Sequence, residues 1–275
     1  HVFPLRAENG GVLRRAGHDA LARYPDLYAD ELRAAAAARL RVPEACIATG
    51  CGSDDVLDAT YRACGGSPAS FVAVAVPTFS RALPLAQMNG MRARAVPWSD
   101  ALSDPERLLE GSPALVYVCR PNNPTGGLAP SAWVEALLEA AGEGGPLVLL
   151  DEAYVDFGGD TFAARAADHP RLLVSRTLSK AFGLAGLRVG YSVAATPTAL
   201  EVEKSSGPYK VSRLAAEAAA WLFALHPAGI AGARTARRKN SAGTAWLKVV
   251  SVMTAPERPS TASTGLVIGP TVNSG

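Results

Sequence analysis

The 275-residue sequence has little of what zinc-binding, membrane-spanning or strongly charged proteins need. Its four cysteines and four histidines are scattered without CxxC spacing, which argues against a metal site. The net charge is only +2, so neither nucleic acid nor an anionic membrane is an expected partner. No apolar run is long enough to span a bilayer, and the first residues show no secretory signal. These absences together predict a cytoplasmic protein with reduced thiols.

What the sequence does have is apolar content. Hydrophobic residues make up 48% of the chain and charged residues 19%, which is typical of a folded globular protein rather than a disordered one. A chain of this length can form one large domain with a well-buried core and a smaller appendage.

Helical and strand patterns alternate between about residues 27 and 200. Such alternation predicts a largely parallel sheet that is covered by helices on both faces, and in such sheets ligands bind at the carboxyl ends of the strands. Beyond residue 200 two more helices are expected, and from about residue 229 no period is sustained. The expected helices are 27–40, 54–64, 81–88, 130–141, 200–204 and 214–225, and the expected strands are 70–76, 114–119, 146–150, 172–175 and 188–193.

A lysine in a hydroxyl-rich loop follows one of the expected strands. The loop runs from Ser175 to Lys180, and Arg188 comes eight positions later, after a glycine-rich stretch. Hydroxyl groups and a guanidinium are the groups that bind a phosphate, so this segment is a candidate phosphate site. Taken alone, a lysine such as Lys180 is more often a solvated surface residue.

Two further motifs follow strands. Asp151 comes directly after the strand at 146–150, where a carboxylate can pair with a protonated pyridine nitrogen and make the ring an electron sink. The alternative for Asp151 is a residue that only ends the strand and caps a turn. The segment Pro121-Asn122-Asn123-Pro124-Thr125-Gly126 is a rigid turn that can present an Asn side chain with little loss of entropy.

Two weaker elements complete the candidate site. The segment from Gly50 to Asp55 opens a helix, whose free amides can bind phosphate together with the Ser53 hydroxyl. The carboxylates of Asp54 and Asp55 are better suited to capping that helix. Phe79 follows the strand at 70–76 and offers a flat ring for stacking, although a core position is an equal alternative.

The chain resembles the class I/II pyridoxal-phosphate-dependent aminotransferases, most closely the histidinol-phosphate aminotransferase branch. The matching stretches are RYPDLYADELR, TGCGSDDVLD, PTFS, RPNNPTG, LLDEAYVDF, RTLSKAFGLAGLRVGY and GPYKVSRLA, which span roughly residues 19 to 225. The resemblance implies an aspartate-aminotransferase-like α/β fold, the three-layer α/β/α large domain of fold type I. It also implies an N-terminal arm at 1–26, a cofactor-binding large domain at 27–200 and an incomplete small domain at 201–275.

The same resemblance implies roles for individual side chains around pyridoxal 5'-phosphate. Lys180 would carry the cofactor covalently, Asp151 would pair with its ring nitrogen, and Asn123 and Tyr154 would bond to its phenolic oxygen. Phe79 would stack on the ring. The phosphate would be held by Ser53, by the backbone of Asp54, by Thr177, Ser179 and Arg188, and by Tyr24 of a partner subunit in a homodimer.

The implied reaction is transamination between L-histidinol phosphate and 2-oxoglutarate, as in histidine biosynthesis, with Lys180 moving the proton. Three alternatives remain: an aromatic or other amino acid as the amine substrate, a decarboxylase like the threonine-phosphate enzymes, and a truncated remnant without activity. The chain departs from the family at two places. Ala7-Glu8-Asn9-Gly10 stands where the family usually has an Asn-Glu-Asn-Pro-like stretch, and Ser212 stands where it usually has Asn. The family's substrate-binding arginine has no clear counterpart, and Arg213 and Arg237 are the candidates.

Overall fold

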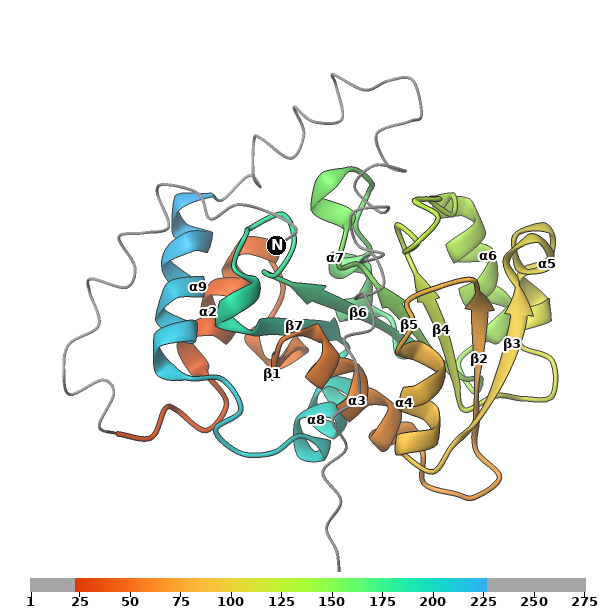
Figure 1. Cartoon of the computed structure of the whole chain (residues 1–275), viewed down its shortest axis with the longest axis horizontal. Coiled ribbons are helices and arrows are strands. Elements are labelled where there is room, and N and C mark those ends of the chain that lie inside the picture. Colours follow the sequence, from red (N-terminus) through yellow and green to blue (C-terminus); the bar gives the residue numbers. More distant parts are fainter. Residues whose placement is uncertain (1–22, 227–275) are drawn as a thin grey trace, which may run out of the picture.

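Seven strands form one mixed sheet in the computed structural model, which describes residues 23–226 (Figure 1). The strand order is β1-β7-β6-β5-β4-β2-β3. Strand β7 is antiparallel to both of its neighbours, and the pairs β2–β3, β2–β4, β4–β5 and β5–β6 are parallel. The strands are β1 (Ile47–Cys51), β2 (Phe71–Val76), β3 (Arg92–Pro97), β4 (Leu115–Cys119), β5 (Leu147–Asp151), β6 (Leu172–Thr177) and β7 (Val189–Ala194).

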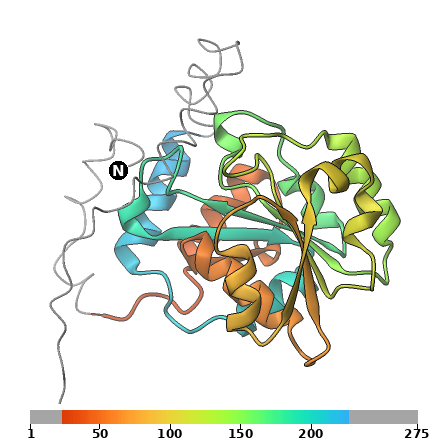
Figure 2. The same cartoon turned by 45° about the vertical axis from the view of Figure 1, so that its right-hand side comes forward.

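Helices cover both faces of this sheet, so the three-layer α/β/α prediction is confirmed (Figures 1 and 2). One face packs against α3 (Ser53–Cys64), α4 (Ala82–Met88) and α8 (Thr196–Ser205). The other face packs against α2 (Asp30–Leu40), α5 (Trp98–Ser103), α6 (Ser131–Ala141), α7 (Ala163–Asp168) and α9 (Arg213–Leu225). Short 3-10 turns lie at Glu44–Cys46, Pro105–Leu108, Val155–Phe157 and Ala185–Leu187.

The central strands are buried at every position. Strands β4, β5, β6 and β7 have no exposed residue, as expected for strands that are covered on both faces. Their Val- and Leu-rich sequences suit this environment, because each residue packs against a helix on one side or the other. The sheet is therefore a largely apolar platform, with few polar side chains inside its central strands.

Two strands and two short helices were not predicted from the sequence. Strand β1 is five residues long and contains glycine and threonine, and edge strand β3 carries Arg92 and Arg94 among its apolar residues. The helices α5 and α7 have six residues each, too few to show a helical period. The predicted helix at 200–204 is the second half of α8, which begins at Thr196.

Ser212 begins the last described helix. It is the N-cap of α9, and its Oγ accepts a hydrogen bond from the Ala215 amide at 3.3 Å. Serine and asparagine are both strong N-cap residues, so Ser212 caps this helix as an Asn would. Residues 1–22 of the predicted arm at 1–26 and residues 227–275 of the predicted small domain at 201–275 lie outside the described residues, and the division at 26 and 200 remains a prediction. Within residues 23–226, no helix is both long enough and apolar enough to cross a membrane.

Candidate functional site

Six chain segments meet at one edge of the sheet. Strands β2, β4, β5 and β6 run parallel and end there, and β1 ends there and leads through Gly52 into α3. Strand β7 runs the opposite way, so its beginning, just after Arg188, lies at the same edge. The polar motifs that the sequence analysis singled out follow or precede these strand ends, so the topology brings them together.

Asp151 is the last residue of β5 and is buried, with 3% of its surface exposed. Its Oδ2 accepts a hydrogen bond from the Tyr117 hydroxyl at 2.8 Å, and its Oδ1 accepts one from the Ala153 amide at 3.1 Å. Burial raises the pKa of the Asp151 carboxyl above its usual value, whereas these two bonds lower it. The side chain is thus oriented by two donors rather than free to rotate.

Lys180 is partly buried on the loop after β6, and its Nζ lies 5.5 Å from the centre of the Tyr154 ring. Burial lowers the pKa of this amine below its usual value, and the Asp151 carboxylate opposes the shift. Tyr154 is itself buried, which raises the pKa of its phenol and keeps it protonated. Lysine, aspartate and tyrosine therefore form one electrostatically coupled group.

Three of the predicted phosphate-binding side chains lie next to one another. The Thr177 and Ser179 hydroxyl oxygens are 3.0 Å apart, and the Ser179 amide donates to the Thr177 hydroxyl at 3.1 Å. Arg188 points its Nη1 at the Ser179 hydroxyl at 3.5 Å and is held by the Ala185 carbonyl at 3.2 Å. Hydroxyls and a half-exposed guanidinium thus converge on one place, which suits an anion.

The start of α3 closes this anion site from the other side. A Cβ on Gly52 would lie 2.4 Å from Arg188 Nη2, and one on Gly190 would lie 2.3 Å from the Ser53 amide nitrogen. Only glycine allows the backbone to come this close at both positions. The N-terminus of α3, with Ser53, is therefore pressed against β7 beside Arg188, where its free amides can face a phosphate.

The two aspartates at the start of α3 behave differently. The Asp55 carboxylate accepts a hydrogen bond from the Cys51 amide at 2.9 Å, which fits the predicted capping role. Asp54 instead pairs with Arg188, with Oδ2 and Nη2 separated by 3.5 Å. The capping prediction for the Asp54 side chain is therefore wrong, because the guanidinium of Arg188 offers it a charged partner instead.

The two asparagines of the proline-rich turn also differ. Asn122 is buried and its amide donates to the Pro77 carbonyl at 2.9 Å and to the Thr125 hydroxyl at 2.8 Å, while it accepts from the Thr78 hydroxyl at 3.0 Å. Asn122 therefore ties the β2 and β4 loops together. Asn123 is only partly buried, as is Phe79, which packs against the core beneath it.

A buried charge network behind the site was missed by sequence reasoning. Arg176 donates through Nη2 to both carboxylate oxygens of Asp156, at 2.9 and 2.8 Å, and through Nη1 to Glu152 at 3.2 Å. Glu152 and Asp156 flank Tyr154 in sequence, and Arg176 is four residues before Lys180. The network thus links the segment that carries Tyr154 to the strand that leads to Lys180.

Tyr117 was missed as well. It is the one aromatic residue of β4, and its ring is completely buried beneath the Asp151 carboxylate. Two signals could have revealed it: a phenol in an otherwise aliphatic strand needs a partner for its hydroxyl, and Tyr117 stands two residues before the position that pairs with Asp151.

The remaining candidates lie at the surface or beyond the described part. Tyr24 is 81% exposed, and its ring centre is 4.9 Å from that of Tyr209. Arg213 is exposed on α9 and donates to Glu217 at 2.9 Å. Arg237 and the segment 7–10 fall outside the described residues.

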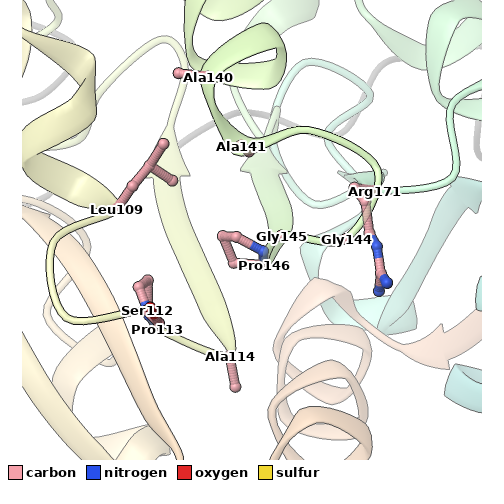
Figure 3. A pocket seen from close by; sticks show the side chains of 10 residues that line it. All are labelled: Leu109, Ser112, Pro113, Ala114, Ala140, Ala141, Gly144, Gly145, Pro146 and Arg171. Carbon is pink, nitrogen blue, oxygen red and sulfur yellow. The ribbon is translucent and has the colours of Figure 1, made fainter.

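A surface hollow of about 540 Å³ lies at the opposite edge of the sheet (Figure 3). Ala114, Pro146 and Arg171, which line it, directly precede β4, β5 and β6. Of the described residues that line it, only Arg171 is charged, and its Nε donates to the Glu143 carbonyl at 2.6 Å. The hollow is therefore separate from the polar edge around Lys180. The described residues contain no group of three or more His, Cys, Asp or Glu side chains placed to bind a metal.

Comparison with known proteins gives consistent matches. Residues 7–227 match the family described as aminotransferase class I and II. A histidinol-phosphate aminotransferase of Methylibium petroleiphilum is 40% identical over 233 residues, covering 82% of this chain and 61% of the relative. An aromatic amino acid aminotransferase of Streptomyces coelicolor is 37% identical over 208 residues, covering 72% of this chain and 56% of the relative.

A solved structure agrees with these sequence relatives. The histidinol-phosphate aminotransferase of Sinorhizobium meliloti, in complex with pyridoxal-5'-phosphate, aligns with a TM-score of 0.72 at 28% identity. The alignment covers 80% of this chain and 61% of that one. The chain thus spans about three fifths of the length of the proteins it matches.

Proposed function

Because this chain belongs to the class I and II aminotransferases, we propose that it binds pyridoxal phosphate at Lys180 and transfers an amino group from histidinol phosphate to 2-oxoglutarate. The observation that carries the proposal is the joint placement of Lys180, Asp151 and Arg188 at one edge of the sheet. It supplies an amine, a buried carboxylate and a phosphate-binding cation in one place.

The residues present fit this cofactor. A Cβ at Gly52 would collide with the Arg188 guanidinium and one at Gly190 with the backbone at Ser53, so the two glycines let the start of α3 lie directly beside the guanidinium, as a phosphate shared by both requires. Asp151, held by two donors, keeps lone pairs for a further partner, as a protonated ring nitrogen requires. When bound, pyridoxal phosphate supplies an electron sink for negative charge at the α-carbon of the substrate.

Each residue of the site then has a defined task. Burial shifts Lys180 toward the neutral amine, whose lone pair can accept the proton of the substrate α-carbon and later return a proton. Asp151 would stabilise the positive charge of the ring nitrogen, and the protonated Tyr154, with Asn123, would donate to the phenolic oxygen. Phe79 would cover one face of the ring.

The phosphate would be held by Arg188, by the hydroxyls of Thr177 and Ser179, and by the first amides of α3 at Ser53 and Asp54. We also propose a homodimer in which Tyr24 reaches the phosphate of the partner subunit. Its support is the exposure of Tyr24 beside Tyr209, since large exposed aromatic groups are typical of interfaces. A cytoplasmic location is in keeping with four free cysteines.

A second candidate substrate is an aromatic amino acid, which is favoured by the Streptomyces coelicolor relative. This chain spans only about three fifths of the length of its relatives, so its amino donor is to be determined by experiment. Purified chain should therefore be given histidinol phosphate, phenylalanine or tyrosine, with 2-oxoglutarate, and its products analysed. Glutamate formed with histidinol phosphate supports the main proposal, glutamate with an aromatic donor supports the second, and released carbon dioxide would indicate a decarboxylase.

The cofactor site is tested independently of turnover. Borohydride reduction of the chain after incubation with pyridoxal phosphate, followed by peptide mapping, should label Lys180. The variant Lys180→Ala should lose the label, whereas the matched control Lys204→Ala should keep it, because Lys204 is an exposed residue paired with Glu201. A label on another lysine with Lys180 unmodified would contradict the assignment.

A further inference from the structure

Tyr117 is a polar residue in the middle of a fully buried strand. It stands in β4 among Leu, Val and Cys, and none of its surface is exposed. A buried phenol without a partner is unfavourable, and Tyr117 meets this need by donating to Asp151 Oδ2 at 2.8 Å. The bond joins two buried side chains.

The strand register explains why this bond forms. Cys119 pairs with Asp151 across β4 and β5, and side chains two residues apart in a strand point to the same face. Tyr117 therefore lies on the same face as Asp151, one step deeper in the sheet. The Tyr117 side chain is long enough to span that step, so its hydroxyl reaches Oδ2 of the carboxylate. The Ala153 amide donates a hydrogen bond to the other oxygen, Oδ1.

The bond also favours the ionised form of the carboxylate. Burial raises the pKa of Asp151, and the hydrogen bond from Tyr117 is the strongest influence that lowers it. Since a hydrogen bond to the ionised form favours ionisation, loss of the hydroxyl would leave Asp151 with a higher pKa.

We propose that Tyr117 is a positioning residue whose hydroxyl orients the Asp151 carboxylate toward the ring nitrogen of the cofactor. This inference rests on the proposed function, because it requires that a pyridine ring binds above Asp151. Because none of the surface of Tyr117 is exposed, its hydroxyl would act on the cofactor through Asp151 rather than by direct contact.

The chain contains a matched control in Tyr61. This residue lies on α3, is also completely buried, and has its ring centre 6.5 Å from that of Tyr117 in the same core. Its hydroxyl has no hydrogen-bond partner among the described residues. Tyr61→Phe therefore removes the same oxygen atom from the same core without removing a bond to Asp151.

The test measures binding of two ligands to the full chain: pyridoxal phosphate and its 1-deaza analogue, in which carbon replaces the ring nitrogen. Tyr117→Phe should raise the dissociation constant of pyridoxal phosphate about tenfold, as expected for loss of a hydrogen bond to a charged group. It should change that of the deaza analogue less than about twofold, because Asp151 has no nitrogen to pair with there. Tyr61→Phe should leave both constants within about twofold of the parent chain.

If Tyr117→Phe weakened the binding of both ligands equally, Tyr117 would have a structural role only. If it weakened the binding of neither, the inference would also be overturned. If the parent chain bound neither ligand, the proposed function would fail instead, and a ligand-free measurement then decides the role of Tyr117. In the ligand-free chain, unfolding by urea is followed between about pH 5 and about pH 8.

The expected sign in that measurement follows from the raised pKa of Asp151. A carboxyl whose folded pKa lies above its unfolded one loses stabilisation as the pH rises through the folded pKa. Tyr117→Phe should therefore destabilise the chain more at the higher pH, whereas the effect of Tyr61→Phe should not depend on pH. A pH-independent effect of Tyr117→Phe would overturn the inference. Both variants keep Asp54, Cys119, Tyr154 and Lys180, which act on Asp151 electrostatically. The Tyr61 phenol also couples to Asp151, but burial raises its pKa, so it stays protonated and uncharged between about pH 5 and about pH 8.

Discussion

The ion network of Arg176 offers a quantitative test of how the site is held. Arg176 is 4% exposed and Glu152 is completely buried, and Arg176 makes three hydrogen bonds to Glu152 and Asp156. Arg176→Met keeps an unbranched apolar side chain but removes the cation. Two carboxylates then remain close together with less positive charge between them.

The expected loss of stability can be worked from these contacts. Removal of one partner of a buried ion pair costs about 3–5 kcal/mol. Glu152 keeps hydrogen bonds from the Thr161 hydroxyl at 2.6 Å and the Phe162 amide at 2.8 Å, and Asp156 keeps Arg39 at 3.9 Å. These remaining partners place the expected loss at the lower end, about 3 kcal/mol.

The loss should also depend on pH. Burial raises the pKa of Glu152 and Arg176 lowers it, so Arg176→Met raises this pKa further. A carboxyl with a raised folded pKa is stabilising below its unfolded pKa of about 4.3, and this contribution is lost as the pH rises through the folded pKa. The variant should therefore lose more stability near pH 8 than near pH 5, roughly the two sides of that transition.

Urea unfolding followed by tryptophan fluorescence measures both effects. The control is Lys204→Met, which breaks an exposed pair with Glu201 and should cost less than about 1 kcal/mol at every pH. The double variant Arg176→Met/Glu152→Gln should lose most of the pH dependence, because its neutral amide cannot titrate. A loss for Arg176→Met no larger than that of Lys204→Met would refute the reasoning.

Two further predictions concern the cofactor and the partner subunit. Asp54 pairs with Arg188 at 3.5 Å, and both side chains are about half exposed. Asp54→Asn should therefore free the guanidinium and tighten pyridoxal-phosphate binding roughly two- to fivefold, as measured by equilibrium dialysis. Weaker binding would show that Asp54 supports the site. Mixed Lys180→Ala and Tyr24→Phe chains should form hybrid dimers with one intact site and regain activity that neither parent shows. A monomer by light scattering with saturating cofactor would exclude that sharing.

The strands that could be predicted are those whose residues are apolar at nearly every position. Strands β4 and β5, with sequences LVYVC and LVLLD, are apolar at almost every position, so the sequence predicts that both faces are covered. Strand β3 could not be predicted in this way. Its residues Arg92 and Arg94 suggest a solvated loop, but in the structure their guanidinium groups lie 6.0 and 5.8 Å from the centre of the Phe71 ring at the sheet edge.

The placement of a candidate site residue was predictable where the residue lies at a strand end, and unpredictable where it depends on a neighbour in space. Lys180 and Asp151 lie at the carboxyl ends of parallel strands, and Arg188 directly precedes the antiparallel β7, so the order and direction of the strands bring the three together. Tyr117 lies within a strand, and its hydrogen bond to Asp151 depends on the register of β4 against β5, which no local pattern reveals. The Arg176 network likewise depends on the packing of two separate segments.

The reversal of β7 is the feature on which the proposed anion site depends. A parallel β7 would place its first residue at the amino edge of the sheet, away from Lys180 and Asp151. Because β7 is antiparallel to both β6 and β1, Arg188 lies beside the end of each of them, and Gly190 lies opposite Gly50 and against the start of α3. Arg188 meets this path with a left-handed backbone (φ 54°), a conformation that non-glycine residues rarely adopt. The glycine-rich stretch before β7 therefore reverses the chain direction. As a result, the Arg188 guanidinium lies beside both the lysine loop, at Ser179, and the N-terminus of α3, at Asp54.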